Sequence, residues 1–555
     1  MPEFFSHPWL NKDAIEKREY QEKILQTATK GNTLCVLPTG TGKTAIAALV
    51  SAYRFEKFPD GKILLVAPTK PLTRQHRDSF EKFLKIGPDE LRVITGATNA
   101  EERVDEYKRA WVVFATPQTI SSDLKKHGLS LKDFSLLIVD ESHRSTGDYA
   151  YTFIAKKYME EATNPLIIGL TASPGADKTR IAAICKNLFI ENVEIRTEQD
   201  DDISPYVQPV KTHWVKVELP EEFEKIRGLL QAALDRRIKF LIKFHHLHYL
   251  RVSKKQLLEL QHVLRKKAIA EQDGMLFQAM SVAIQCIKIN HALELIQSQG
   301  LVPLRSYLEK IVKGGKKTKA GRSILEDEDI QQAVAITESL YERGIDHPKF
   351  ETLQQILKEN MTPEKKAIVF TQYVDTVNEI VKKISALGSL SVEKSASDDN
   401  EKSEKEKNVA EKTQTTKLPK IRAVKFIGQR KGLTQKRQIS ILRDFRDGLY
   451  NVLVATSIGE EGLDLPSVDL VIFFEPVPSE IRSIQRRGRT GRFAPGEIFI
   501  LMAKDTIDEA YYWSAYHKEK RMKAILYDMQ DEGVAGGAIG GWTSKKIKQK
   551  GLSEF

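Results

Sequence analysis

Short apolar runs, alternating with polar stretches of ten or more residues, constrain the fold of this 555-residue chain more than any other feature. From about residue 32 to 200 the runs are TLCVL, KILLVA, WVVFA, LLIVD and PLIIGL. Runs of this length without strict alternation are typical of parallel strands that are buried on both faces. A second set follows late in the sequence: KAIVFT, IRAVKFIG, NVLVATS, DLVIFFE and EIFILMA. The sequence therefore predicts two doubly wound α/β domains with parallel sheets.

The sequence between these two sets has a different pattern. Long segments such as FEKIRGLLQAALDRRIKFLIKF repeat apolar residues with the period of an α-helix. We therefore predict α/β domains at 1–210 and 346–530, separated by an all-α insertion at 211–345. The stretch from about 388 to 420 mixes both charge signs with almost no large apolar residue, so we expect a disordered insertion there. Glycines mark 531–555 as a flexible tail.

The charge balance restricts the partners of the chain. Its net charge of +11 and its isoelectric point near 9.1 favour a polyanion, with nucleic acid ahead of a membrane surface. No apolar run approaches the roughly 18 residues that span a bilayer, and the N-terminus lacks the layout of a signal peptide. We therefore expect a soluble, cytoplasmic protein. The three cysteines each stand alone, which argues against a disulfide framework or a cysteine zinc site.

The segment VLPTGTGKT, residues 36–44, is typical of a loop that binds the phosphates of ATP. It follows an apolar strand and precedes an apolar helix, although Leu37 stands where the strict pattern has glycine. Its glycines allow backbone N–H groups to turn toward the phosphates, its lysine reaches the β and γ oxygens, and its last threonine ligates magnesium. The predicted binding residues for ATP and Mg²⁺ in this loop are Thr39, Gly40, Thr41, Gly42, Lys43 and Thr44.

The segment LLIVDESH, residues 136–143, supplies acidic groups for the same chemistry. Asp140 follows a buried run, where it can hold magnesium through water, and Glu141 can orient and deprotonate an attacking water. The alternative is that the two acids only cap a following helix. His143 by itself is more typical of a hydrogen-bonded structural residue.

The segment QRRGRTGR, residues 485–492, places four arginines within eight residues. So much positive charge requires acidic neighbours or a bound anion. We expect the γ-phosphate of ATP to be that anion, because an arginine that approaches it during hydrolysis contributes roughly 10³ to 10⁵ in rate. If the second α/β domain carries this arginine, hydrolysis requires the two domains to close, and the chain is a motor.

Several motifs resemble, in order and spacing, those of the superfamily-two helicases. REYQ (18–21) resembles their adenine-reading motif, which implies base contacts for Arg18 and Gln21. The other matching segments are APTKPLTRQH (67–76), TG (95–96), ATPQTI (115–120), TASP (171–174), IVFTQY (368–373) and ATSIGEEGLDLP (455–466). This resemblance implies two RecA-like motor domains. It also implies nucleic-acid contacts at Pro68, Thr69, Lys70, Gly96, Thr116, Pro117, Gln118, Thr371 and Thr456.

The same resemblance assigns roles in the second motor domain. It implies that Arg489 and Arg492 are the arginine fingers and that Gln485 communicates with His143 and the γ-phosphate. It also implies a ribose contact for Asp464. The neighbouring arginines at 486 and 487 are then expected to serve domain closure or packing.

Within the superfamily, DESH, the long segment that ends in QRRGRTGR, and the helical insertion together resemble the archaeal Hef helicase and the Fanconi-anaemia M translocase. The resemblance implies ATP-driven remodelling of branched DNA, with the insertion gripping duplex. Candidate contacts there are Lys254, Lys255, Lys316 and Lys317, although a solvated helix face explains such clusters equally well. Ser142 replaces a cysteine of the family motif, and we expect no change in chemistry. About sixty residues follow Arg492 without a nuclease core, so we expect no strand cutting.

The last seven residues, QKGLSEF, resemble a motif that binds sliding clamps, with Gln549, Leu552 and Phe555 as the contact residues.

The sequence leaves two other functions open for the chain. The same motor could act on duplex RNA, since no motif here discriminates a 2′-hydroxyl. A scaffold that does not hydrolyse ATP would be expected to have lost Lys43, Glu141 or Arg489, and all three are present.

Overall fold

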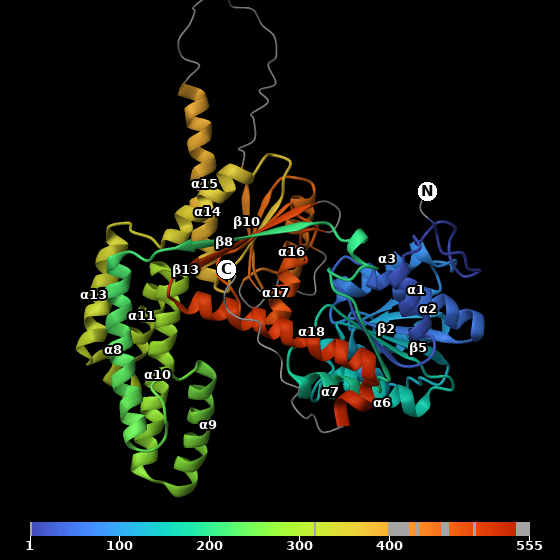
Figure 1. Cartoon of the computed structure of the whole chain (residues 1–555), viewed down its shortest axis with the longest axis horizontal. Helices are drawn as coiled ribbons and strands as arrows, with labels where there is room; N and C mark the ends of the chain where they lie inside the picture. The colour runs from blue at the N-terminus through green and yellow to red at the C-terminus, as the bar shows by residue number, and fades with distance from the viewer. Residues whose placement is uncertain are drawn as a thin grey trace, which may run out of the picture. The chain divides into compact units, whose positions relative to one another are not determined.

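The computed structural model describes residues 3–315, 318–397, 421–428, 432–456, 465–491 and 495–539. The chain divides into two compact units, one of Met1–Val207 with Tyr516–Phe555 and one of Gln208–Ala515. Each unit contains one parallel sheet covered by helices, and the second unit also contains a helical bundle (Figure 1). The predicted class, two α/β domains with an all-α insertion, is confirmed.

The sheet of the first unit has the strand order β3-β4-β2-β5-β6-β1-β7. Its strands are β1 Thr33–Val36, β2 Lys62–Val66, β3 Leu91–Ile94, β4 Val112–Ala115, β5 Phe134–Asp140, β6 Ile167–Thr171 and β7 Asn192–Ile195. Its helices are α1 Glu19–Ala28, α2 Lys43–Lys57, α3 Lys70–Phe83, α4 Ala100–Arg109, α5 Pro117–Lys126, α6 Ala150–Glu161 and α7 Lys178–Asn187. The five predicted runs all form strands, whereas the short β3 and β7 were not predicted.

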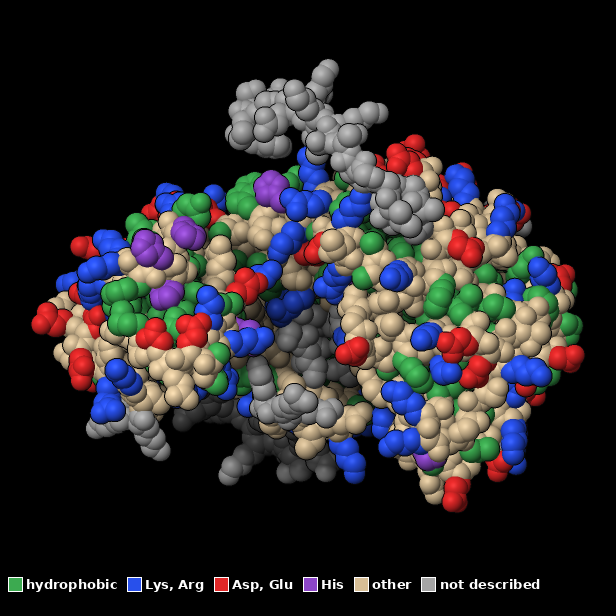
Figure 2. Space-filling model, turned by 90° about the horizontal axis from the view of Figure 1, so that it is seen from below, with side chains coloured by type: hydrophobic (Ala, Val, Ile, Leu, Met, Phe, Trp, Pro, Cys, Tyr) green, Lys and Arg blue, Asp and Glu red, His purple; other side chains and the backbone are tan. Residues whose placement is uncertain are grey.

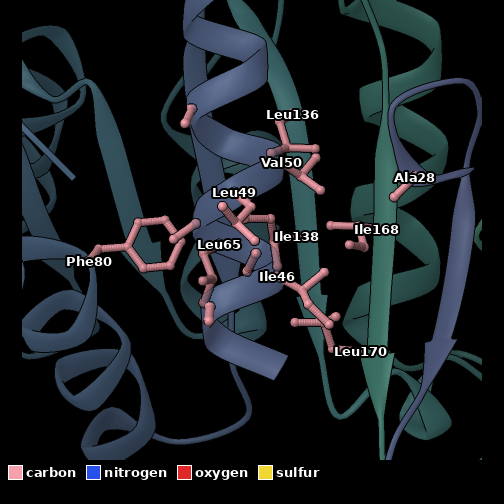
Figure 3. Packing of buried hydrophobic residues seen from close by; sticks show 14 of the residues in the cluster. Ala28, Ile46, Leu49, Val50, Leu65, Phe80, Leu136, Ile138, Ile168 and Leu170 are labelled. Atoms are coloured by element: carbon pink, nitrogen blue, oxygen red, sulfur yellow. The ribbon is translucent and has the colours of Figure 1, made fainter. Parts of the chain in front are cut away.

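Helix α2 is the centre of the first core, and its burial fixes the loop that precedes it. Figure 3 shows Ile46, Leu49 and Val50 of this helix against Leu65 of β2, Leu136 and Ile138 of β5, and Ile168 and Leu170 of β6. Each such side chain contributes about 1.5 to 3 kcal/mol on burial. The start of α2 is therefore held firmly over the carboxyl ends of the central strands.

The sheet of the second unit has the strand order β10-β11-β9-β12-β13-β8. Its strands are β8 Val210–Val217, β9 Ala367–Phe370, β10 Ala423–Phe426, β11 Val452–Ala455, β12 Leu470–Phe473 and β13 Gly496–Ala503. All the predicted runs of this half form strands. Strand β8 was not predicted, and it pairs with β13 from Val210 opposite Gly496 to Val217 opposite Ala503. Because β8 is an edge strand with half-exposed side chains, its sequence lacks a continuous apolar run.

Long helices that run alongside one another form the insertion (Figure 1). They are α8 Glu221–Lys243, α9 Lys254–Glu271, α10 Gly274–Ser298, α11 Leu301–Gly315, α12 Lys319–Leu325 and α13 Glu328–Glu342. The remaining helices are α14 Pro348–Asn360, α15 Val374–Ser397, α16 Gln435–Arg446, α17 Glu480–Arg487 and α18 Ile507–Ile539. Among the described helices, none combines the length and the apolar character that crossing a membrane requires.

Two predicted irregular segments are partly helical. Helix α15 continues to Ser397, so 388–397 does not belong to the predicted disordered insertion, and 398–420 lies outside the described residues. Helix α18 continues through 531–539 of the predicted flexible tail, with a kink at Gly533, where φ is +78°.

Candidate active site

The predicted phosphate loop connects β1 to α2, and its glycines have the backbone conformation that the prediction requires. Gly40 and Gly42 have φ of +83° and +81°, in the left-handed region that side chains disfavour. A Cβ atom on Gly42 would lie 2.8 Å from Nε2 of Gln21. Leu37, at the position of the missing glycine, is fully buried in the core, so it does not intrude on the loop. The backbone of the loop can therefore turn its N–H groups toward phosphate.

Lys43 is the first residue of α2, and its ammonium group lies over the phosphate loop. Its Nζ donates hydrogen bonds to the carbonyl oxygens of Leu37, at 2.9 Å, and Pro38, at 3.0 Å. Thr44 follows in the first turn of the same helix. Both predicted side chains thus occur at the helix N-terminus, where the helix dipole favours an anion.

The adenine-reading segment packs directly on this loop. Tyr20 Oη donates to the carbonyl oxygen of Thr41 at 2.5 Å, and Gln21 Nε2 donates to Tyr20 Oη at 3.4 Å. The Arg18 guanidinium lies 4.9 Å from the ring centre of Tyr206. The Oε1 atom of Gln21 is buried and has no hydrogen-bond partner among the described residues. A buried acceptor without a partner is costly, and the exocyclic amine of adenine would satisfy it.

Tyr20 is a site residue that the sequence analysis missed. Its place between the two predicted residues of REYQ was the available signal, but a hydroxyl that supports the loop backbone only becomes visible in three dimensions.

Asp140 ends β5 beside the phosphate loop, and its environment favours the charged form. Its Oδ2 lies 2.9 Å from Nε2 of His76, on α3. Burial alone would raise the pKa of Asp140, but His76 and the Lys43 charge outweigh burial and hold this pKa below its usual value. The side chain is therefore a carboxylate at neutral pH, as a magnesium ligand must be. His76 was not predicted, because it lies 64 residues away in sequence.

Glu141 has a strained backbone, with φ of +50° and ψ of +48°. Such a conformation costs a non-glycine residue free energy, and residues that adopt it are enriched at functional sites. Its Oε2 lies 3.2 Å from Nδ1 of His143. The single turn that follows, Ser142–Arg144, receives no side-chain cap from Glu141 in the described structure. The alternative role of these acids as helix caps is therefore not what the structure shows.

His143 connects this segment to TASP. Its Nδ1 lies 3.3 Å from Oγ1 of Thr171, which in turn accepts a hydrogen bond from the backbone N–H of Ser173 at 3.1 Å. Ser173 Oγ donates to the sulfur of Met522, in α18, at 3.0 Å. The segments LLIVDESH and TASP, which are separate in sequence, are thus connected by a series of buried contacts next to Glu141.

The segments predicted to contact a nucleic-acid strand, APTKPLTRQH, TG and ATPQTI, are named the strand-tracking motifs; they lie at the carboxyl ends of β2, β3 and β4, which are neighbours in the sheet. Pro68, Thr69 and Lys70 join β2 to α3, Gly96 follows β3, and Thr116, Pro117 and Gln118 join β4 to α5. A Cβ atom on Gly96 would lie 3.9 Å from Oγ1 of Thr119, so two of these loops adjoin. The starts of α3 and α5 therefore present N-terminal amides at one edge, which suits backbone phosphates.

The candidate residues of the second unit that the structure describes are mostly buried. Thr371 is fully buried and donates a hydrogen bond to Oε1 of Gln299 at 3.2 Å, and Thr456 is 3% exposed. Gln485 is buried in α17, and Arg489 follows that helix half-buried. Arg486, expected to serve packing or closure, is fully buried with its guanidinium 5.1 Å from the ring centre of Phe370.

Two candidate lysines of the insertion have acidic partners. Lys254 lies 2.6 Å from Glu294, and Lys255, which is largely exposed, lies 3.7 Å from Glu259. The remaining candidates lie outside the described residues: Lys316, Lys317, Asp464, Arg492, Gln549, Leu552 and Phe555.

The residues of this site fit ATP and magnesium. Gly40 and Gly42 have left-handed backbone, the contacts of Asp140 hold its pKa below the usual value, and the buried Gln21 acceptor lacks a partner in the described region. These three observations fit a nucleotide with a divalent cation at one end and adenine at the other.

Three family descriptions match the chain. They are "Type III restriction enzyme, res subunit" over residues 14–176, "Putative ATP-dependent RNA helicase, helical bundle" over 222–342, and "Helicase conserved C-terminal domain" over 400–494. The first and last fall within the two α/β halves, and the second falls within the bundle.

Individual relatives extend this match over almost the whole chain. A Methanocaldococcus jannaschii protein named "Putative ATP-dependent RNA helicase MJ1505" is 38% identical over 95% of this chain and 63% of its own length. The Mus musculus "Fanconi anemia group M protein homolog" is 31% identical over 94% of this chain and 26% of its own length. This chain therefore spans less than two thirds of either relative.

A solved structure shows the family. The crystal structure of the Pyrococcus furiosus Hef helicase domain is 41% identical, with a TM-score of 0.68, and the match covers 91% of this chain and 100% of that one. Since the chain contains that whole domain together with the site described above, it belongs to the superfamily-two helicase family of archaeal Hef and the Fanconi-anaemia M proteins.

Proposed function

We propose that this protein is an ATP-driven DNA translocase that remodels branched DNA, such as stalled replication forks and Holliday junctions, in DNA repair. The observation that carries the proposal is one continuous sheet edge in the first unit. The ATP groups lie at the ends of β1 and β5, and the strand-tracking motifs lie at the ends of the adjoining β2, β4 and β3. The residues proposed to hydrolyse ATP and those proposed to bind the polynucleotide backbone thus lie at the same edge of one sheet.

The residues of the proposed ATP site supply distinct steps of hydrolysis. Lys43 binds the β and γ oxygens, and Thr44 and Asp140 would hold Mg²⁺, which neutralises phosphate charge when bound. Glu141 orients the attacking water and accepts its proton, and Nδ1 of His143 lies 3.2 Å from its carboxylate. Arg489 and Arg492 stabilise the transferring γ-phosphate, Gln485 reports its presence, and Asp464 contacts the ribose.

The insertion supplies the grip on DNA in this proposal. Figure 2 shows basic, acidic, histidine and hydrophobic side chains intermixed on the face of the bundle that it draws. Exposed apolar residues of the α8–α9 connection and of α9 include Tyr249, Leu258 and Ile269. Lys254, Lys255, Lys316 and Lys317 are the proposed phosphate contacts of this part of the chain.

A duplex-RNA translocase is the second candidate. The name of the Methanocaldococcus jannaschii relative and the description of the bundle family both specify RNA. The two candidates share the whole ATP site, and they differ only in the polynucleotide that stimulates it.

ATP turnover decides between the candidates. The wild type and Lys43→Ala are compared with no nucleic acid, linear duplex DNA, a synthetic fork, and duplex RNA of matched length. Strongest stimulation by the fork, lost in the variant, supports branched-DNA remodelling. A preference for RNA overturns the substrate and leaves the motor intact, whereas no turnover under any condition overturns the motor.

The C-terminal QKGLSEF is proposed to bind a sliding clamp of the PCNA type through Gln549, Leu552 and Phe555. Such a contact would raise the local concentration of the motor at replication sites. Titration of the clamp by calorimetry tests this, with Leu552→Ala and Phe555→Ala expected to abolish the heat of binding. Unchanged binding by both variants removes the assignment.

A further inference from the structure

The C-terminal end of α10 is seated in the α/β part of the second unit by several polar contacts. Gln297 Oε1 accepts a hydrogen bond from the backbone N–H of Ile507 at 2.9 Å. The carbonyl oxygen of Ser298 accepts from Lys349 Nζ at 3.1 Å, and Glu294 accepts from Tyr511 Oη at 3.2 Å. This helix end is therefore one of the joins between the bundle and the α/β part of the unit, alongside the hydrogen bond that Arg227 of α8 donates to the carbonyl oxygen of Asp505 at 3.0 Å.

Gln299, which caps α10, makes the contact nearest to the helicase motifs. It is fully buried, and its Oε1 accepts hydrogen bonds from Thr371 Oγ1 at 3.2 Å and Thr376 Oγ1 at 2.8 Å. Its Nε2 donates to Ser298 Oγ at 3.0 Å. One amide thus holds the end of β9 and the start of α15 against the bundle.

The contacts continue from Thr371 to α17. The residue before Thr371 is Phe370, whose ring centre lies 5.1 Å from the guanidinium of Arg486. Arg486 also donates to the carbonyl oxygen of Glu475 at 3.5 Å and is fully buried in α17. The same helix carries Gln485 and leads into Arg489. A shift of the Thr371 backbone would therefore reach the motif proposed to sense the γ-phosphate.

Buried charges surround this path. Lys349 and Asp508 are both fully buried, with Nζ and Oδ2 2.5 Å apart, and Glu475 is 1% exposed. Desolvation makes such groups expensive, and apolar residues of similar volume are often no less stable. Because hydrogen bonds and ion pairs require specific distances and directions, these groups restrict the position of the C-terminal end of α10 more than apolar contacts would.

We infer that Gln299 is a positioning residue that couples the helical insertion to α17 during nucleic-acid-stimulated ATP hydrolysis. Helix α10 has 25 residues, so it spans about 37 Å, and buried side chains along its length pack it into the bundle core. When the bundle moves upon binding a polynucleotide, helix α10 transmits this movement to Gln299, and Gln299 transmits it to Thr371. The inference rests on the proposed stimulation by nucleic acid and holds for whichever polynucleotide stimulates the wild type.

The test compares two identical substitutions in the same helix region. Gln299→Leu removes the acceptor for both threonines. Gln285→Leu is the matched control, because Gln285 is 5% exposed and accepts from Arg237 at 2.8 Å and Ser323 at 3.3 Å, entirely inside the bundle. Melting temperature, basal turnover, KM for ATP and the Kd for the polynucleotide are measured for both variants and the wild type.

Both variants are expected to lose melting temperature. In Gln299→Leu, the stimulation of kcat by the polynucleotide is expected to fall about fivefold or more, which corresponds to a typical coupling free energy. The Kd for the polynucleotide and the basal turnover are expected to stay near the wild-type values. Gln285→Leu is expected to keep its stimulation. Equal loss or equal retention of stimulation in the two variants overturns the inference, and so does a loss that is explained by weaker polynucleotide binding.

A milder variant keeps the inference testable if Gln299→Leu does not fold. Thr376→Val removes one donor to Gln299 with almost no change in volume, and Thr376 is fully buried away from the proposed ATP residues. It is expected to lower the stimulation about two- to threefold, and full stimulation in a folded Thr376→Val protein contradicts the coupling. A wild type that shows no stimulation refutes the proposed function instead.

Discussion

The imidazole Nε2 of His76 lies 2.9 Å from Oδ2 of Asp140, and both side chains are buried. The first belongs to a strand-tracking motif and the second is the proposed magnesium ligand. This contact therefore joins the sheet edge proposed to bind nucleic acid to the proposed magnesium ligand of the ATP site.

Replacing His76 tests this tie. His76→Ala removes the partner that orients the carboxylate, so half-saturation of ATP turnover is expected to require about tenfold more magnesium. His76→Gln, which retains a hydrogen-bond donor, is expected to recover part of the loss. His127→Ala, an exposed histidine of the same unit, serves as control. A magnesium titration that is identical for His76→Ala and the wild type contradicts the assignment.

Gln21 is predicted to select the base. Because its buried Oε1 has no partner among the described residues, Gln21→Ala is expected to raise KM for ATP about tenfold while GTP hydrolysis changes little. Gln26→Ala, an exposed glutamine on the same helix, is the matched control. Parallel ATP and GTP saturation curves measure the ratio, and an unchanged preference for ATP rules out base reading by this residue.

Glu475 gives the second unit a pH-dependent stability. Burial raises the pKa of Glu475 to about 7, although Arg486, Lys349 and the Gln299 side chain lower it, and Asp508 raises it further. The folded chain thus holds a proton that the unfolded chain releases, so this group lowers the free energy of unfolding as pH rises from about 4.5 to 7. The loss is about 3 kcal/mol at most.

Glu475→Gln removes that titration. Thermal melts of the variant and the wild type between pH 5 and 8 are expected to show the variant gaining relative stability as pH rises. A difference in melting temperature that does not change with pH would show that Glu475 titrates at its ordinary value.

Replacing Ser142 is predicted to increase the free energy of unfolding of the protein. Its side chain is fully buried, and its Oγ has no hydrogen-bond partner in the described part of the chain. Ser142→Cys restores the family residue, and because a thiol tolerates burial without a partner, the expected gain is about 1 kcal/mol. Denaturant unfolding measures the gain, and kcat is expected to stay unchanged. Ser142→Ala separates loss of the hydroxyl from the packing of sulfur; a less stable Ser142→Cys contradicts the argument.

The local parts of the site could be predicted because short segments determine them. Gly40 and Gly42 need left-handed backbone, which glycine alone adopts without strain, and their spacing is fixed within one turn between a strand and a helix. Likewise Asp140 follows an apolar run, so its place at a strand end could be inferred from its neighbours in sequence. Burial on both faces also makes central strands visible as continuous apolar runs.

The contacts between distant segments were decided only by the tertiary structure. His76 and Asp140 are 64 residues apart and Gln299 and Thr371 are 72 apart, and no local pattern in either member specifies its partner. The edge strand β8 could not be predicted for a related reason: most of its side chains are at least partly exposed, so its sequence has no continuous apolar run. Sequence thus determined which chemistry the chain carries, since that depends on residue type and local conformation. Packing decided which groups meet, since that depends on how helices and sheets bring remote segments together.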